Sequence, residues 1–388
     1  MFRYFEQLTS RIAAPFVSET RRNSKVWQCR CGQSIFFPNT QCLACAAELG
    51  YLPEQGRLVA LEPHQDANVW CVVDEPGRGL YRRCANLETP AACNWLYPAW
   101  ASDDFCVACS LNRTIPDLSI PENGERWRKV ETAKRRLVAQ LIALGLTVIP
   151  KSVDEHNGLA FDFVGVDLEG KLPTTGHADG LITLDIKEAD DVHREAIRIQ
   201  MHEPYRTLLG HFRHEVGHYY WDRLIAGSFW QDGFRQLFGD ERANYADALE
   251  HHYQNGTPDD WQQGFVSAYA TMHPWEDWAE TWAHYLHMMD AVDTALGFGM
   301  SAREMDLDYQ PFPLETLYDP QHPGGPAFLA FVNAWLELAG MLNELSRSMG
   351  QPDFYPFVLS PPVITKLHFI HLVIQDAGGK ADEALQAQ

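Results

Sequence analysis

Two histidines, His214 and His218, stand four residues apart in the sequence, and Glu215 follows the first. If the segment is helical, this spacing puts both imidazole rings on one face about one turn apart, where each can offer a nitrogen to the same ion. Glu215 would then project close enough to take a proton from a water on that ion. The pattern is typical of a zinc site that hydrolyses peptide bonds. The alternative is a solvent-exposed helix face whose histidines bind no metal, because so short a pattern also recurs by chance.

A hydrolytic zinc site needs a third protein ligand, and three sources come into question. A longer form of the motif is excluded, because Trp221 and Leu224 stand where it requires glycine and histidine. An aspartate from FGDERANYADALEHH (residues 238–252) stays open but follows no ligand pattern. The third source is HPWEDWAETWAHYLH (residues 273–287), in which four candidates recur at helical spacing: Glu276, Glu280, His284 and His287. Glu276 lies in the first turn after Pro274, where a second helix can meet the first without crowding the ion.

All nine cysteines lie before residue 110, and eight of them form two candidate metal sets. The first set has the spacing Cys-x-Cys-x10-Cys-x2-Cys and consists of Cys29, Cys31, Cys42 and Cys45. Two close pairs on separate turns suit a tetrahedral zinc site with four thiolates. The second set is looser and consists of Cys84, Cys93, Cys106 and Cys109; scattered core cysteines are its alternative. Cys71 is left over, and we expect it to be a buried free thiol in a strand.

The cysteine-rich and cysteine-free parts of the chain predict an α+β protein with two domains. We expect a zinc-ribbon module in residues 1–115, a linker in 116–123, a mainly helical domain with a small mixed sheet in 124–376, and a mobile tail in 377–388. Helical periodicity begins at Glu125 and ends at Gly145, and a further helix carries the histidine motif. Between them we expect strands in LTVIP, LAFDFVGV and GLITLDI (residues 146–150, 159–166 and 180–186), the last as a sheet edge for an extended peptide.

Composition describes a globular chain of 388 residues with 46% hydrophobic residues and twelve tryptophans. Residues 1–115 hold 11 basic and 11 acidic residues, so residues 116–388 carry the whole net charge of −21. Such an acidic part repels phosphate backbones and acidic membranes, which argues against nucleic acid as the main partner. No uninterrupted apolar run approaches the roughly 18 residues that a membrane helix needs. The N-terminus has no apolar signal region, and we expect a cytoplasmic location.

The two site-bearing segments resemble the glutamate-ligand zincins, a group that includes thermolysin and anthrax lethal factor. In the lethal-factor type a tyrosine precedes the ligand glutamate by seven residues and a second glutamate follows it by four; Tyr269, Glu276 and Glu280 match these positions. Most of residues 25–370 are similar to a bacterial family of zinc-binding metallopeptidases that join a zinc ribbon to a zincin domain. The stretches CNWLYP, CVACSLNRTIPDLS, AKRRL, EPYRTLLGHFRHEVGHYYWDRL, DWAETWAHYLH and PFVLS carry this similarity.

Motif and resemblance together predict a zinc metallopeptidase acting on a peptide or protein substrate. His214, His218 and Glu276 would hold the catalytic zinc, Glu215 would be the general base, and Tyr269 would donate to the oxyanion. Three further residues are expected to orient the histidine ligands: Glu280, Asp222 and His284. Two structural zinc ions would complete the set. The main alternative is a non-catalytic zinc-binding interaction or sensing module, although such a module could dispense with Glu215.

Overall fold

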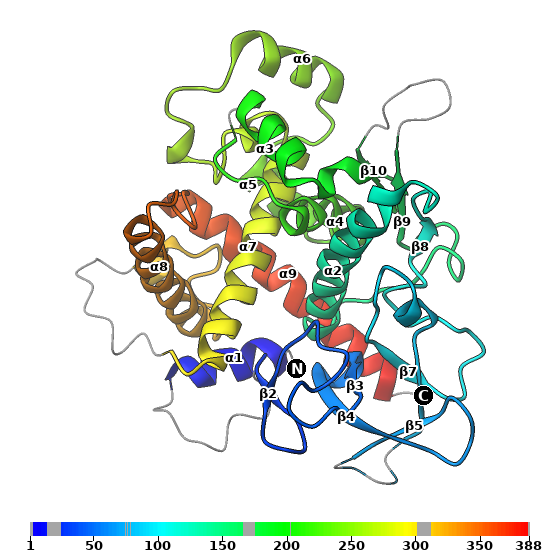
Figure 1. Cartoon of the computed structure of the whole chain (residues 1–388). Helices are drawn as coiled ribbons and strands as arrows, with labels where there is room; N and C mark the ends of the chain where they lie inside the picture. The colour runs from blue at the N-terminus through cyan, green and yellow to red at the C-terminus, as the bar shows by residue number, and fades with distance from the viewer. Residues whose placement is uncertain are drawn as a thin grey trace.

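A computed structural model describes residues 3–13, 25–73, 75, 77, 79–165, 175–201, 203–300 and 312–386. Its N-terminal part contains short strands and irregular turns, and its C-terminal part is mainly helical (Figure 1). The expected α+β class is confirmed. Both parts share one continuous core, because Cys84 and Trp95 in the first belong to the same buried cluster as Trp127 and Phe161 in the second.

The N-terminal module contains a small hairpin and a five-stranded antiparallel sheet. The hairpin pairs β1 (Trp27–Gln28) with β2 (Ser34–Ile35), and its turn carries two cysteines of the first set. The sheet runs in chain order through β3 (Leu49–Leu52), β4 (Arg57–Pro63), β5 (Trp70–Val72), β6 (Tyr81–Arg83) and β7 (Leu96–Pro98). Cys71 lies in β5 as expected, but it is half-buried rather than buried, because its strand lies away from the main core.

The second sheet is mixed and has the order β10-β11-β9-β8. Strands β8 (Asn112–Thr114) and β11 (Leu181–Asp185) both pair in parallel with β9 (Ala160–Val164), whereas β10 (Gly176–Ala178) is antiparallel to β11. The expected edge position of residues 180–186 is therefore wrong, since the short strand β10 covers β11. Residues 146–150 form no strand and contribute one bridge, between Pro150 and Leu159.

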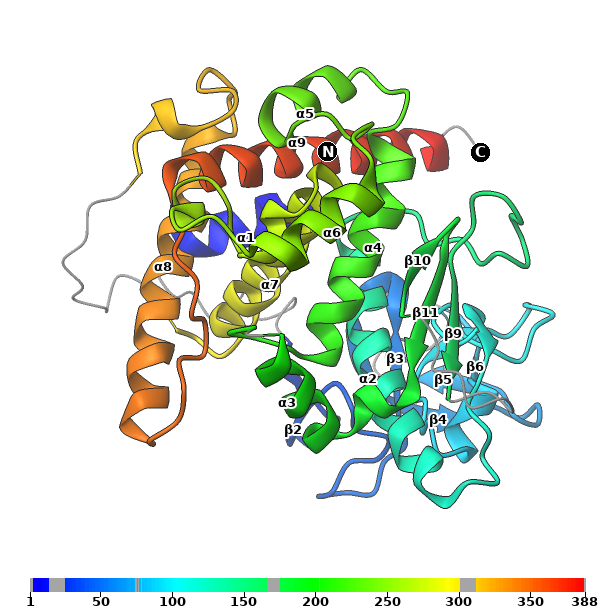
Figure 2. The same cartoon turned by 90° about the horizontal axis from the view of Figure 1, so that it is seen from above.

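Three helices position the histidine motif: α2 (Pro121–Ala143), α4 (Leu208–Leu224) and α7 (Pro274–Gly297). Figure 2 shows α2 and α4 on one side of the mixed sheet. Helices α4 and α7 approach closely at Gly217, where an added Cβ would lie 3.0 Å from the Cα of Ala279. The Trp278 indole donates to the Gly217 carbonyl at 2.8 Å. A small residue in the motif thus lets the two ligand-bearing helices meet.

The remaining helices surround this centre. They are α1 (Arg3–Ala13), α3 (Asp191–Gln200), α5 (Gln231–Phe238), α6 (Tyr245–Asn255), α8 (Gly325–Ser348) and α9 (Pro361–Gln386). Helix α1 precedes the ribbon in sequence yet packs in the second domain, where the Phe5 ring lies 5.7 Å from that of Phe331. Helix α9 includes residues 377–386 of the expected tail, and Ala377 packs against the core.

Within the described residues, one helix is long and apolar enough to cross a membrane by length and composition alone. This is α8, whose most apolar 18-residue window has a mean hydropathy of 1.3. Asn333 and Glu337 interrupt its apolar residues, so the helix contains no long uninterrupted apolar run. Half of the window is buried inside the protein, as in a core helix.

Candidate metal centre

Helix α4 begins at an N-cap, Thr207, whose hydroxyl accepts from the Gly210 amide at 3.0 Å. Helix α7 begins with Pro274 after His273, whose ring accepts from the Trp275 amide at 3.1 Å. These caps fix where each helix starts. They place the motif histidines in the middle of α4 and Glu276 in the first turn of α7.

The structure brings together the side chains of His214, His218 and Glu276. The two Nε2 atoms lie 3.2 Å apart, and the carboxylate oxygens of Glu276 lie 2.9 Å from His214 Nε2 and 3.5 Å from His218 Nε2. Ligand bonds of about 2.0–2.1 Å in tetrahedral geometry place ligand atoms about 3.3 Å apart. The three spacings therefore fit a zinc ion.

A second observation supports this fit. Glu276 is almost fully buried, and its Oε2 makes no hydrogen bond within the described part of the chain although His214 Nε2 is near. A buried carboxylate oxygen without a donor is costly. The two histidine Nε2 atoms lie within hydrogen-bond distance of each other and beside this carboxylate, and a cation shared by the three groups would explain why they converge. We conclude that the donor set suits zinc.

Glu215 lies beside this set without belonging to it. His211, one turn earlier on α4, contacts its Oε1 through Nε2 at 3.2 Å. Burial raises the pKa of Glu215, but the hydrogen bond from His211 and the charge of His214 outweigh burial and bring the pKa to about 2. Glu215 is therefore ionised at neutral pH and able to accept a proton.

Of the three residues expected to orient the histidines, one does so. Glu280 accepts from His214 Nδ1 at 2.7 Å, which leaves Nε2 of His214 for the centre. Asp222 makes no hydrogen bond to either histidine within the described residues. His284 is directed away from α4, and its Nδ1 contacts the Tyr355 hydroxyl at 2.6 Å. The prediction was wrong because helical periodicity gives the face on which His284 lies but not its distance from α4.

Two tyrosines also lie beside the centre. The ring of Tyr269, in the short helix η6 (Tyr269–Thr271), lies 6.0 Å from that of His214. Sequence reasoning missed Tyr245, whose hydroxyl donates to Glu276 Oε1 at 2.9 Å. Burial and the negative charge of Glu276 raise the pKa of both tyrosines, so both are neutral donors. His211 was missed too; its spacing of four residues before Glu215 was the available signal.

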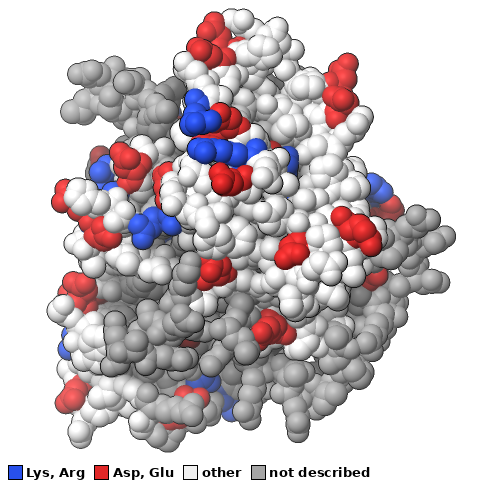
Figure 3. Space-filling view, turned by 180° about the vertical axis from the view of Figure 1, so that it is seen from behind, with Lys and Arg blue, Asp and Glu red and all other residues white. Residues whose placement is uncertain are grey.

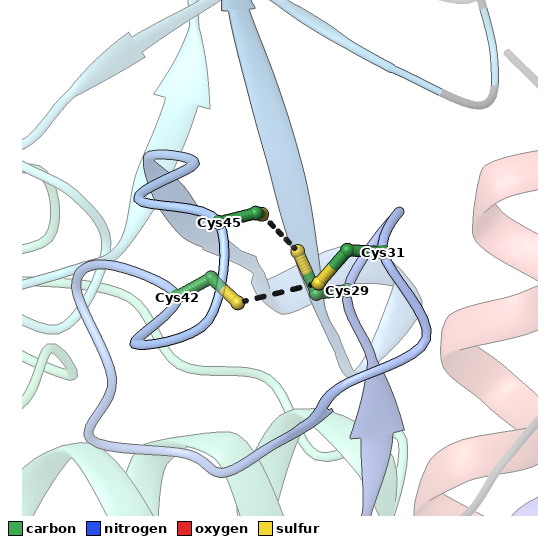
Figure 4. Close-up of side chains that lie close together, drawn as sticks. All are labelled: Cys29, Cys31, Cys42 and Cys45. Carbon is green, nitrogen blue, oxygen red and sulfur yellow. Dashed lines mark hydrogen bonds between the residues drawn. The ribbon is translucent and has the colours of Figure 1, made fainter.

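Both cysteine sets also converge. In the first, Cys29 and Cys45 sulfurs lie 3.6 Å apart, and those of Cys31 and Cys42 lie 3.7 Å apart (Figure 4). Zinc–sulfur bonds of about 2.3 Å in tetrahedral geometry predict about 3.8 Å between sulfurs. Hydrogen bonds from the backbone at Cys45 and Ala44 lower the pKa of Cys42 to about 6, although burial opposes them. Burial raises the pKa of Cys29, so the thiols of this set differ in acidity.

The second cysteine set is fully buried. Cys93 and Cys106 sulfurs lie 3.6 Å apart, and the Cys106 amide donates to Cys84 sulfur at 3.5 Å. All four sulfurs lie within 4.8 Å of one another, as do those of the first set. Scattered core cysteines would not converge in this way. The second set therefore has the arrangement of a metal site despite its looser spacing in sequence.

Comparison with known proteins agrees with this geometry. Residues 123–373 match the family described as "Putative zinc-binding metallo-peptidase". The chain belongs to this family. Residues 26–120 match a zinc-ribbon domain. Uncharacterized proteins of Mycobacterium tuberculosis and Mycobacterium bovis are 44% identical over 347 residues, which cover 89% of this chain and 94% of theirs. No solved structure matches. Membership of a zinc-binding metallopeptidase family with an N-terminal zinc ribbon is thus established.

Proposed function

We propose that this metallopeptidase-family chain is an active zinc-dependent peptidase, with its catalytic centre at His214, His218 and Glu276. The convergence of two imidazole nitrogens and one buried carboxylate, whose Oε2 has no hydrogen-bond donor among the described residues, is the observation that carries the proposal. Glu215 adds to it, because this ionised carboxylate has a place beside the centre but no place in the ligand set. A purely structural metal site would not need it.

When bound, zinc supplies a Lewis acid and lowers the pKa of a coordinated water toward about 7. Glu215 takes the proton of the attacking water and passes it to the leaving amine. His211 holds Glu215 in place for both transfers. Glu280 keeps the proton of His214 on Nδ1, so that Nε2 is free to bind. Tyr269 donates to the peptide carbonyl oxygen as negative charge develops there.

Strand β10 is the proposed place for an extended peptide. It lies at the end of the mixed sheet, and no described residue pairs with its outer side. The ring of His177, on β10, lies 6.3 Å from that of His218, which puts this edge next to the centre. An extended substrate could add to the sheet as a further strand. Main-chain hydrogen bonds to β10 would then hold it, and its side chains would determine which sequences bind.

The proposal includes three zinc ions per chain, one catalytic and two in the cysteine sets. The substrate would be a peptide or protein met in the cytoplasm, and we expect neither a membrane nor nucleic acid as partner. On the face in Figure 3 the basic side chains lie beside acidic ones and form no continuous basic patch. Elemental analysis of protein purified without added metal should give close to three zinc ions. A zinc content near one ion per chain, with cysteines that react freely with a thiol reagent, would contradict the two zinc ions proposed for the cysteine sets.

Glu215→Gln tests the mechanism most directly. The change removes the base but no proposed ligand, so zinc content and unfolding temperature should stay while hydrolysis of a quenched peptide library is lost. Glu250→Gln, an exposed glutamate of α6, is the matched control and should keep full activity. Activity that survives in Glu215→Gln would sink the mechanism.

Glu276→Ala and Glu280→Ala separate the ligand from the residue that orients it. Glu276→Ala should lose the catalytic zinc while the two ribbon ions stay. Glu280→Ala should keep the zinc but bind it about 10–100-fold more weakly. Competition with a chelator measures both affinities. A catalytic zinc that is retained in Glu276→Ala would show that the third ligand lies elsewhere.

A further inference from the structure

Helix α6 is held to the rest of the protein by few contacts. No residue of α6 is buried, and the helix ends at Gly256, which has positive φ. Its first residue, Tyr245, nevertheless reaches the metal centre, because its hydroxyl donates to Glu276 Oε1 at 2.9 Å. A helix with an exposed body therefore places one side chain against a proposed metal ligand.

This hydrogen bond divides the two oxygens of Glu276 into different roles. Oε1 accepts from Tyr245 and lies 3.5 Å from His218 Nε2, whereas Oε2 lies 2.9 Å from His214 Nε2 and has no hydrogen-bond donor among the described residues. A carboxylate whose one oxygen is held by a donor cannot rotate freely about its terminal torsion. Oε2 is thereby kept directed toward His214. Donors of this kind fix the orientation of ligand carboxylates in metal sites.

A packing role for Tyr245 is the alternative. Its ring lies 5.3 Å from that of His273 and 6.4 Å from that of Trp275, both at the start of α7. These contacts belong to the ring and would survive the loss of the hydroxyl. The two roles can therefore be separated by removing the oxygen atom alone.

We propose that Tyr245 is a positioning residue for Glu276 and that α6 serves to deliver it. The inference rests on the proposed function only through the assignment of Glu276 as a metal ligand. The hydroxyl orients the carboxylate and so strengthens binding of zinc at the catalytic centre. It takes no part in the reaction itself.

The test measures zinc affinity and does not depend on activity. Full-length protein with its ribbon ions in place is titrated with a competing chelator in the wild type and in Tyr245→Phe, Tyr245→Leu and Tyr253→Phe. Tyr253 lies on the same helix and is 63% exposed, so its variant controls for changes in α6. Tyr245→Phe should weaken catalytic zinc binding about 10–100-fold at unchanged unfolding temperature. Tyr245→Leu should weaken it to a similar extent, and Tyr253→Phe should have no effect.

An affinity in Tyr245→Phe equal to that of the wild type would overturn the inference, and a loss seen only in Tyr245→Leu would assign the residue to packing. Glu276→Ala separates this failure from a wider one. If Glu276→Ala loses the catalytic zinc while Tyr245→Phe binds normally, Tyr245 alone is misassigned. If Glu276→Ala retains the catalytic zinc, the proposed ligand set is wrong, and the role inferred for Tyr245 is wrong as well.

Discussion

The first cysteine set lies at the surface of the N-terminal module, whereas the second lies between that module and helix α2. In the first, Cys31 is exposed and Leu43, within its second cysteine pair, is 95% exposed. In the second, every cysteine is buried, and Cys109 contacts Glu131 of α2 with 3.9 Å between sulfur and oxygen. Four sulfurs at similar spacing are thus built into the molecule in two different ways.

The chain leaves the two sets differently as well. The first set closes within a hairpin and one further turn, and the chain then enters the ribbon's own sheet. Cys109 is followed directly by β8, which pairs with β9 of the mixed sheet. Helix α2 then returns to the set, where Lys134 and Glu131 form a fully buried ion pair at 2.7 Å. The second set therefore lies against helix α2 of the helical domain, whereas the first is enclosed by turns of the N-terminal module, with Cys29 and Cys42 reaching the shared core.

The largest expected difference concerns loss of one cysteine. Cys106→Ser should destabilise the whole protein, because the apparent free energy of structural zinc binding, about 10–16 kcal/mol, contributes directly to folding. Cys31→Ser should lose one ion and leave the helical domain folded. Zinc content together with far-UV circular dichroism during thermal unfolding measures both. The same loss of helical stability in the two variants would contradict this difference between the two cysteine sets.

A smaller difference is expected for the charges beside each set. Glu131→Ala leaves the charge of Lys134 buried with the neutral Asn112 as its remaining hydrogen-bond partner and should cost about 3–5 kcal/mol. Glu62→Ala breaks an exposed pair with Arg30 at 3.1 Å beside the first set and should cost less than about 1 kcal/mol. Urea unfolding gives both values.

The double variant Glu131→Ala, Lys134→Met controls for loss of folding in Glu131→Ala. It removes the unpaired charge and should recover much of the lost stability. Equal costs for Glu131→Ala and Glu62→Ala would show that burial does not distinguish the two sets.

The helices that carry the site could be predicted from local patterns, whereas the contacts around them could not. Periodicity and Pro274 predicted where α2, α4 and α7 lie, since each has its apolar stripe and its end signals in sequence. Helix α1 was missed, although Phe5 and Leu8 stand at helical spacing, because its partners lie on α8 far along the chain. The edge strand β10 was missed because Gly176–Ala178 is short and lacks alternating apolar residues.

The candidate centre divides in the same way. Glu276 and Glu280 could be placed beside the histidines by spacing and by resemblance. Tyr245 could not, since it reaches Glu276 across 31 residues from a helix without its own motif. His284 was misplaced for a related reason: two turns along α7 from Glu276, it is on a suitable face but faces Tyr355 rather than α4.

The smallest expected difference is kinetic and leaves the folded protein unchanged. A thiol-reactive disulfide should release the zinc of the first set early, because Cys31 is exposed to the reagent. The second set can react only after the structure opens, and an opening that costs about 3 kcal/mol slows the reaction on the order of 100-fold. A Cys71→Ala background removes the remaining half-buried thiol, so that two phases with one zinc ion each should be resolved. Because a single phase would mean that both sets open together, this experiment asks whether the ribbon and the helical domain unfold as one unit or as two.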